Sequence, residues 1–127
     1  MWLILDNREE GNLQVSGWMN NKLVQSIYSI KENNDFLLAV ERFLSEHTLT
    51  VDDLKGLGVY VGMGRFTASR LLVTLANSLA YSLQIPVLRL EPQIEIQTGF
   101  TLVFQAIAGK YILPVYSGEP HISSLRS

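Results

Sequence analysis

Residues 58–70 of the chain, GVYVGMGRFTASR, decide how the rest of the sequence folds. The apolar run before Gly62 is typical of a buried strand, and two glycines then lead into a segment with helical apolar spacing. A helix that begins at such a turn presents unpaired backbone N–H groups and the positive end of its dipole. The stretch therefore predicts a strand, a glycine turn and a helix, with a candidate anion site at the turn.

This candidate site has a weak sequence signal. The pattern Gly-x-Gly-x-x-Thr falls one glycine short of the dinucleotide fingerprint and lacks the lysine of a P-loop. Asp6 ends the first predicted strand, where sheets of this class bind ligands, but its side chain could equally satisfy its own turn. A tight turn without a ligand is the alternative interpretation. The candidate residues are Asp6, Gly62, Gly64, Arg65, Phe66 and Thr67.

Composition narrows the classes of function. The 127 residues, 47% apolar and 17% charged, fit one globular domain. The absence of cysteine excludes thiolate nucleophiles, zinc knuckles and disulfides, and it fits a reducing compartment. A net charge of -2 with both signs scattered argues against direct nucleic-acid binding. No apolar run reaches the length of a membrane span, and the N-terminal run is too short for a signal peptide, so we expect a cytoplasmic protein.

Apolar periodicity predicts an α/β fold with a mixed sheet and crossover helices. Asn20 and Asn21 connect two runs with strand patterns and predict a hairpin. Two further apolar runs, 100–108 and 110–116, predict a second hairpin near the C-terminus. The predicted strands are 2–5, 13–19, 22–30, 56–61 and 86–90, and the predicted helices are 33–47 and 67–84.

Residues 54–86 resemble, without a gap, the hallmark segment of the bacterial TsaB (YeaZ) family. In that family a strand leads into Gly-Pro-Gly-Ser-Phe-Thr-Gly-Leu-Arg and a small-residue helix that ends in Gly-Ile-Pro. The start of the chain, LILDNREEG, similarly resembles the family's first strand and its Asp-Thr-Ser turn. Asn7 and Arg8 stand where the family has Thr and Ser, and Met63 and Arg65 replace Pro and Ser. The counterparts in the hallmark segment include Gly62, Gly64, Phe66, Thr67, Arg70, Ile85 and Pro86.

The resemblance implies a fold and a role. The fold would be a single actin-like, ribonuclease-H-like lobe over residues 1–97, with a five-stranded mixed sheet whose second strand is antiparallel. Residues 98–127 would be a β-hairpin and tail, a remnant of a second lobe. The role would be that of a noncatalytic partner in making threonylcarbamoyladenosine on tRNA, dimerising with a TsaD-like subunit, joined by a TsaE-like ATPase and meeting tRNA only indirectly. No catalytic residue, cofactor or metal is expected.

The second predicted helix has apolar residues over an arc of about 200°, roughly twice what packing on one sheet requires. We therefore expect a second buried contact, and in the TsaB family the helices of this lobe pack against the partner. The alternative is that the first helix of the same domain covers the whole arc. The predicted partner interface consists of Leu38, Leu72, Val73, Ala76, Ala80 and Leu83.

Two other functions compete with the partner role. The first is a self-associating orphan adaptor, since an exposed apolar helix edge makes a homodimer plausible. The second is an enzyme that binds a nucleotide through Asp6 and the glycine turn. A metal site is not expected, because His47 and His121 are far apart and have no acidic partner at ligand spacing.

Overall fold

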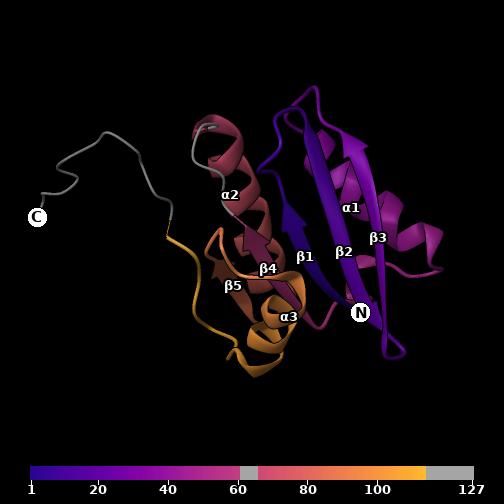
Figure 1. The fold of residues 1–127 in the computed structure, drawn as a ribbon, viewed down its shortest axis with the longest axis vertical. Coiled ribbons are helices and arrows are strands. Elements are labelled where there is room, and N and C mark those ends of the chain that lie inside the picture. Colours follow the sequence, from indigo (N-terminus) through magenta and orange to yellow (C-terminus); the bar gives the residue numbers. More distant parts are fainter. Residues whose placement is uncertain (61–65, 114–127) are drawn as a thin grey trace, which may run out of the picture.

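The computed structural model of the chain describes residues 1–60 and 66–113, with the backbone alone at residues 66–69. Its strands are β1 (Trp2–Asp6), β2 (Asn12–Met19), β3 (Lys22–Ser29), β4 (Gly56–Tyr60) and β5 (Val87–Leu90). Its helices are α1 (Asp35–Glu46), the short 3-10 helix η1 (Val51–Asp53), α2 (Phe66–Leu83) and α3 (Ile96–Gln105). The five strands form one sheet, with α1 and α2 on one face and α3 on the other (Figure 1).

The strand order is β3-β2-β1-β4-β5. β1 pairs with β2 and β2 with β3 in antiparallel fashion, whereas β1 pairs with β4 and β4 with β5 in parallel. Parallel neighbours need a crossover connection, which α1 supplies between β3 and β4 and α2 between β4 and β5. This is the mixed five-stranded sheet with an antiparallel second strand that the resemblance implied.

The hairpin between β2 and β3 turns at Asn20 and Asn21, as predicted. Both residues have positive φ, 53° and 63°, which asparagine tolerates better than most residues. A two-residue turn of this kind follows the right-handed twist of the strands it connects. The resulting register is continuous from Met19 opposite Lys22 to Asn12 opposite Ser29.

The two crossover helices are confirmed and follow local sequence signals. α1 buries the apolar stripe predicted for it, which includes Phe36, Val40 and Phe43. α2 ends at Leu83, and Gln84 caps it in a left-handed conformation with a φ of 57°. Ile85 cannot continue the helix, because the residue before a proline is disfavoured in the helical region. On this face β1, β2 and β4 contribute alternate residues to one core.

The C-terminal hairpin prediction is wrong. Residues 100–105 belong to α3, residues 106–113 contain no strand, and the rest of the predicted hairpin and tail, residues 114–127, lies outside the described residues. Ile96, Phe100 and Val103 recur at helical spacing, and Phe100 and Val103 are buried against the sheet. These residues have a high β propensity, but their helical spacing lets them bury one face against the sheet, and they form a helix. A boundary between residues 97 and 98 would fall inside this helix, which packs on the same sheet as the rest of the lobe.

Candidate functional site

The candidate site lies where β1 and β4 end. Asp6 and Tyr60 are the last residues of these parallel neighbours and are opposite one another in the register. The carboxyl ends of parallel strands are the usual ligand site of α/β sheets. Both side chains lie on the face of the sheet that α3 covers, since Ile4 and Tyr60 belong to the cluster that we call the α3 core. This cluster consists of Ile4, Tyr60, Leu90, Phe100 and Val103.

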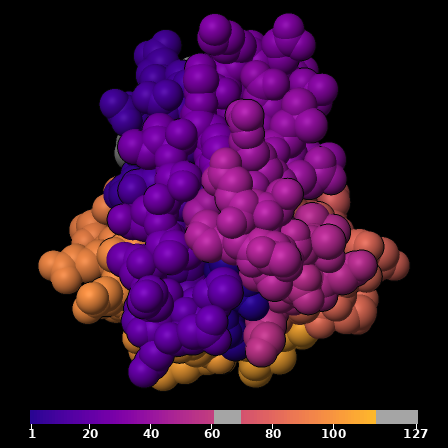
Figure 2. All heavy atoms as spheres, turned by 90° about the vertical axis from the view of Figure 1, so that its right-hand side faces the viewer, coloured from indigo at the N-terminus to yellow at the C-terminus, as the bar shows by residue number. Residues whose placement is uncertain are grey.

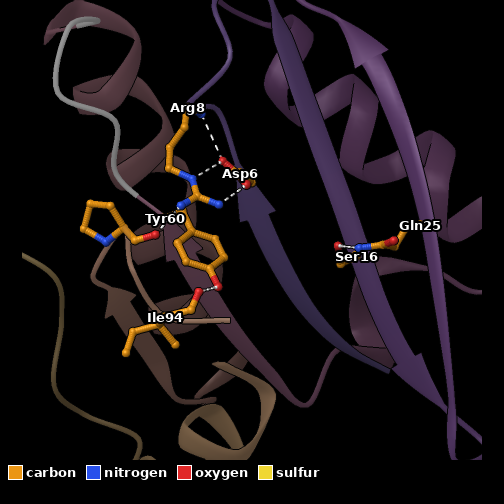
Figure 3. A network of polar contacts seen from close by, with 7 residues as sticks. Asp6, Arg8, Ser16, Gln25, Tyr60 and Ile94 are labelled. Carbon is orange, nitrogen blue, oxygen red and sulfur yellow. Dashed lines mark hydrogen bonds and ion pairs between the residues drawn. The ribbon is translucent and has the colours of Figure 1, made fainter. Parts of the chain in front are cut away.

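The guanidinium of Arg8 binds the Asp6 carboxylate. Its guanidinium donates from Nε to Oδ1 at 3.0 Å and from Nη2 to Oδ2 at 2.8 Å, and its backbone N–H donates to Oδ1 at 3.0 Å (Figure 3). Bidentate pairs of this kind are among the stronger charge-assisted hydrogen bonds. The backbone bond is an Asx turn, in which an Asp side chain mimics a backbone turn. Asp6 thus satisfies its own turn and binds an arginine at the same time.

The same guanidinium joins two further elements. The Cζ atom of Arg8 lies 3.9 Å from the centre of the Tyr60 ring, and Nη1 donates to the Pro92 carbonyl oxygen at 2.6 Å. The Tyr60 hydroxyl donates to the carbonyl oxygen of Ile94 (Figure 3). The turn that follows β5 is therefore tied to the ends of β1 and β4. We call Asp6, Arg8 and Tyr60 the Arg8 clasp.

Arg8 and Tyr60 each keep one protonation state at neutral pH. The hydrogen bonds with Asp6 raise the pKa of the Arg8 guanidinium above its already high ordinary value, against the opposing effect of burial. Burial raises the pKa of the Tyr60 hydroxyl above its ordinary value of 10.0, although the charge of Arg8 lowers it. Arg8 therefore stays charged and Tyr60 stays a hydrogen-bond donor.

An open hollow of about 450 Å³ lies beside the clasp. Its other lining residues come from the turn after β1 and from β2 and β3. Further along the same strands, Gln25 donates from Nε2 to Ser16 Oγ at 2.9 Å (Figure 3). The hollow is lined by Asp6, Arg8, Glu9, Asn12, Gln14 and Ile27.

The clasp determines what the site can do chemically. The Asp6 carboxylate accepts three hydrogen bonds from Arg8, so its oxygens are poorly placed to take a proton from a substrate or to bind a cation. Within residues 1–60 and 66–113, no three acidic, histidine or cysteine side chains gather as metal ligands. The arrangement is best suited to holding the ends of β1 and β4 and the turn after β5 together.

Most of the predicted anion site lies outside the part of the chain that the structure describes in full. Gly62, Gly64 and Arg65 lie outside the described residues. Phe66 and Thr67 lie in the first turn of α2, where the backbone alone is described. Asp6 is the one member whose side chain is described, and it binds Arg8.

The predicted partner interface requires a correction. Of its six residues, Leu38 is 52% exposed and Leu83 is partly buried. The other four belong to the chain's own core, because α1 packs against α2 and residues up to Ile112 add to the same core. The first helix therefore does not cover this arc alone, but the chain itself buries the four residues that are 0–2% exposed, which are Leu72, Val73, Ala76 and Ala80.

The segment 106–113 contributes to that cover. The Asn77 side chain of α2 accepts a hydrogen bond from the Ile112 N–H at 2.9 Å and donates one to the Ile112 carbonyl at 2.8 Å. The Ile112 side chain is 6% exposed, and the rings of Tyr81 and Tyr111 lie 6.2 Å apart. This segment, which we call the α2 strap, is bound to the helix through the amide side chain of Asn77.

Sequence reasoning missed Arg8, Tyr60 and Asn77. Arg8 follows Asp6 by two residues, which is the spacing of an Asx turn and was a usable signal. Tyr60 is the polar-tipped residue that ends a predicted strand parallel to the first. Asn77 carries no local signal, since its partner is 35 residues away.

Two smaller predictions concern His47 and the membrane. His47 is the C-terminal cap of α1, as expected, with its Nδ1 atom 2.8 Å from the Phe43 carbonyl oxygen. None of the described helices is long and apolar enough to cross a membrane.

The class that the geometry defines is a single α/β lobe with sheet order 3-2-1-4-5 and helices on both faces. Two solved structures share it. YeaZ from Pseudomonas aeruginosa superposes with a TM-score of 0.63 at 23% identity, over 71% of this chain and 42% of that one. A protein described as uncharacterized, with similarity to peptidase YeaZ from Pseudomonas aeruginosa, superposes with a TM-score of 0.62 at 24% identity over the same shares.

These likenesses show that the chain shares the fold of part of these two structures. The chain spans 42% of the length of each of these two structures. No protein-family model and no curated protein matches the sequence.

Proposed function

We propose that the chain is a noncatalytic partner subunit of the machinery that makes threonylcarbamoyladenosine on tRNA, and that it dimerises with a TsaD-like subunit. A TsaE-like ATPase joins this pair, and tRNA is met only through the assembly. The observation that carries the proposal is the YeaZ fold at a TM-score of 0.63, found for a chain whose residues 54–86 resemble the hallmark segment of that family.

The Arg8 clasp supports a noncatalytic role. The carboxylate at the end of β1 is the acidic group best placed for chemistry in such a sheet, and Arg8 holds both of its oxygens. Calorimetric titration of the chain with ATP and ADP tests this part of the proposal. Micromolar binding by the isolated chain would favour the competing nucleotide-binding function.

The exposed helix surfaces support a protein partner. Leu38 on α1 is 52% exposed and Tyr81 on α2 is 68% exposed, although each belongs to a helix whose opposite side is buried. Large apolar side chains exposed on neighbouring helices are a feature of protein interaction sites. Because the small-residue edge of α2 is core, we place the partner surface on Leu38, Tyr81 and the partly buried Leu83.

Co-purification tests the partner role. The chain with an affinity tag should retain a TsaD-like subunit when the two are co-expressed, and Leu38→Glu and Tyr81→Glu should each weaken the retention at least tenfold without changing the unfolding midpoint. Gln105→Glu, on an exposed residue of α3 on the other face of the sheet, is the control and should bind normally. Normal retention by both Leu38→Glu and Tyr81→Glu would remove this surface from the proposal, and no retention of the unmodified chain would refute the partner role.

A buried substitution separates folding from docking. Ala76→Glu places a charge at a residue with no exposed surface, so it should unfold the domain rather than block a partner. A folded Ala76→Glu variant that fails to bind would restore the small-residue edge as an interface.

A further inference from the structure

β3 is an edge strand that has hydrogen-bonding neighbours on one side. Its eight residues pair with β2 along their whole length, and no other described strand lies on its outer side. Figure 2 looks at the molecule from this side, where the indigo to magenta part of the chain, which includes β2, β3 and α1, fills the middle of the visible surface. A long edge of this kind presents a row of N–H and C=O groups to solvent.

The hairpin turn determines which residues point outward. In a two-residue hairpin the residues that flank the loop, Met19 and Lys22, form a hydrogen-bonded pair, and such pairs alternate with non-bonded pairs along an antiparallel ladder. Even-numbered residues of β3 therefore bond to β2. The next even residue agrees, because the Ile30 N–H donates to the Gly11 carbonyl oxygen at 2.9 Å. The free backbone groups of β3 belong to Leu23, Gln25, Ile27 and Ser29.

This edge has none of the features that prevent pairing with another strand. Proline, internal charges, bulges and short length are the common ones. β3 has a single charged residue, Lys22 at its start, and its register with β2 has no bulge. The opposite edge differs, since β5 has four residues, carries Arg89 and follows Pro86. The chain therefore protects one edge of its sheet and leaves the other open.

We propose that β3 pairs in antiparallel fashion with β3 of a second copy of this chain, so that one sheet continues across both copies. The two-fold axis passes beside Gln25, and Leu23 of each copy faces Ile27 of the other. Only odd-numbered residues can exchange backbone hydrogen bonds, because the even ones already bond to β2. A two-fold arrangement uses the same patch on both copies, as in most dimers.

Exposure of Ile27 favours this register and this occupant. Ile27 is 61% exposed. Val24 and Tyr28 of the same strand pack against the core beneath α1 and α2. Pairing about Gln25 places Ile27 against an apolar side chain, whereas pairing about Ser26 would place it against Gln25. In this register the one charged residue of β3, Lys22, lies opposite Tyr28 of the other copy, so no like charges face each other.

Single cysteines test the register directly, because the chain has no cysteine of its own. Opposed Cα atoms in a hydrogen-bonded antiparallel pair lie about 5.5 Å apart, within reach of a disulfide. Gln25→Cys should form disulfide-linked dimers in an oxidising glutathione buffer, and so should an equal mixture of Leu23→Cys and Ile27→Cys. Neither of the last two should cross-link alone. Ser78→Cys, exposed on α2, gives the rate of random collision.

A proline substitution tests whether this edge holds the dimer together. The Gln25 N–H points outward, so Gln25→Pro removes a donor from the edge without breaking the ladder to β2. It should halve the native mass measured by light scattering while leaving the circular dichroism unchanged. Gln25→Thr loses the same side-chain bond to Ser16 but keeps the N–H, and it should remain dimeric.

Three results would overturn the proposal. One is a native mass of a single chain for the unmodified protein at the highest soluble concentration. Another is cross-linking of Gln25→Cys no faster than that of Ser78→Cys. The third is preferential cross-linking between Gln25→Cys and Ile27→Cys, which would mean a different register. If Gln25→Pro fails to fold, Ile27→Lys replaces it, because that exposed side chain can become charged without disturbing the core.

Discussion

The two faces of the sheet are covered in different ways. α1 and α2 cover one face with apolar side chains that recur at helical spacing and interlock with alternate strand residues. α3 covers β1, β4 and β5 on the other face, where Gly56 and Gly58 of β4 and Gly99 of α3 let the helix approach closely. The packing of α1 and α2 can be predicted from the spacing of apolar residues along each helix. The packing of α3 depends on glycines, which add no apolar side chain to the sequence pattern. This packing can therefore be recognised only in the assembled structure.

The largest effect that we predict comes from filling the glycine contact under α3. A Cβ atom at Gly58 would lie 2.8 Å from Val103 Cγ2, so Gly58→Val must displace α3. We expect a loss of about 2–3 kcal/mol in the free energy of unfolding, measured by urea titration.

The opposite face supplies the control for Gly58→Val. Gly17→Val would meet Met1 and Phe43 under α1. Trp2 and Trp18 both pack against the α3 core, so their fluorescence in the folded state should change in the Gly58 variant and much less in the Gly17 variant. A Gly58→Val protein as stable as the unmodified chain would contradict the close contact of α3.

The next effect tests whether the contact between α2 and the distant α2 strap stabilises the fold. Asn77→Ala removes both hydrogen bonds to the backbone of Ile112, and we expect a loss of about 1–2 kcal/mol. Hydrogen exchange should become faster in residues 109–113 and stay unchanged in α1. Ser78→Ala is the matched control. Unchanged exchange in the α2 strap would mean that Ile112 is held by packing alone.

The Arg8 clasp joins the strand ends on the α3 side. Arg8→Met keeps a long apolar side chain over Tyr60 but removes the pair with Asp6 and the bond to Pro92. Because the pair is partly exposed, we expect a loss of only about 1 kcal/mol, measured by thermal unfolding at low salt. High salt should reduce the difference. Glu9→Gln, in the adjacent residue, should leave stability unchanged.

A smaller effect of opposite sign comes from the end of α1. Thr48 has a φ of 62°, which is unfavourable for a β-branched residue, and the Leu49 N–H closes the helix by donating to the Leu44 carbonyl oxygen. Thr48→Gly should raise the free energy of unfolding by about 0.5–1 kcal/mol. Thr48→Ala keeps the strain and should not raise it.

The smallest effect is a pH dependence at the start of α1. The backbone N–H groups of Lys31 and Glu32 donate to the Asp35 carboxylate and lower its pKa below the ordinary value of 3.8. A carboxylate whose pKa is lower in the folded state stabilises the fold above its unfolded pKa, and this stability is lost as the pH falls through the folded pKa. Unfolding free energies measured between neutral pH and about pH 2 should therefore fall less steeply in Asp35→Asn. An unchanged slope would mean that the hydrogen bonds do not distinguish the two states.

Most features of the sheet face that α1 and α2 cover could be predicted from the sequence. The stripe of α1, the turn at Asn20 and Asn21 and the end of α2 before Pro86 were all predicted, because each depends on residues within one or two turns of chain. α3 was predicted as a strand because its aromatic and β-branched residues favour either structure, and the glycine contact that seats it lies in β4.

The candidate site was predicted less well than the fold. Asp6 was identified at a strand end, but its partner Arg8 was not, and the apolar edge of α2 was assigned to a partner protein. A helical wheel gives the width of an apolar arc but not the identity of what covers it. The α2 strap, held by Asn77 from a position 35 residues away, supplies part of that cover.

By itself the sequence determined which segments are strands and crossover helices up to β5, since hydrophobic period and turn residues act over short distances along the chain. The tertiary structure alone decided which apolar surfaces remain exposed, that Asp6 binds Arg8, and that the outer edge of β3 is open. Those outcomes depend on contacts between distant segments, where backbone approach and hydrogen-bond geometry are set by the assembled fold.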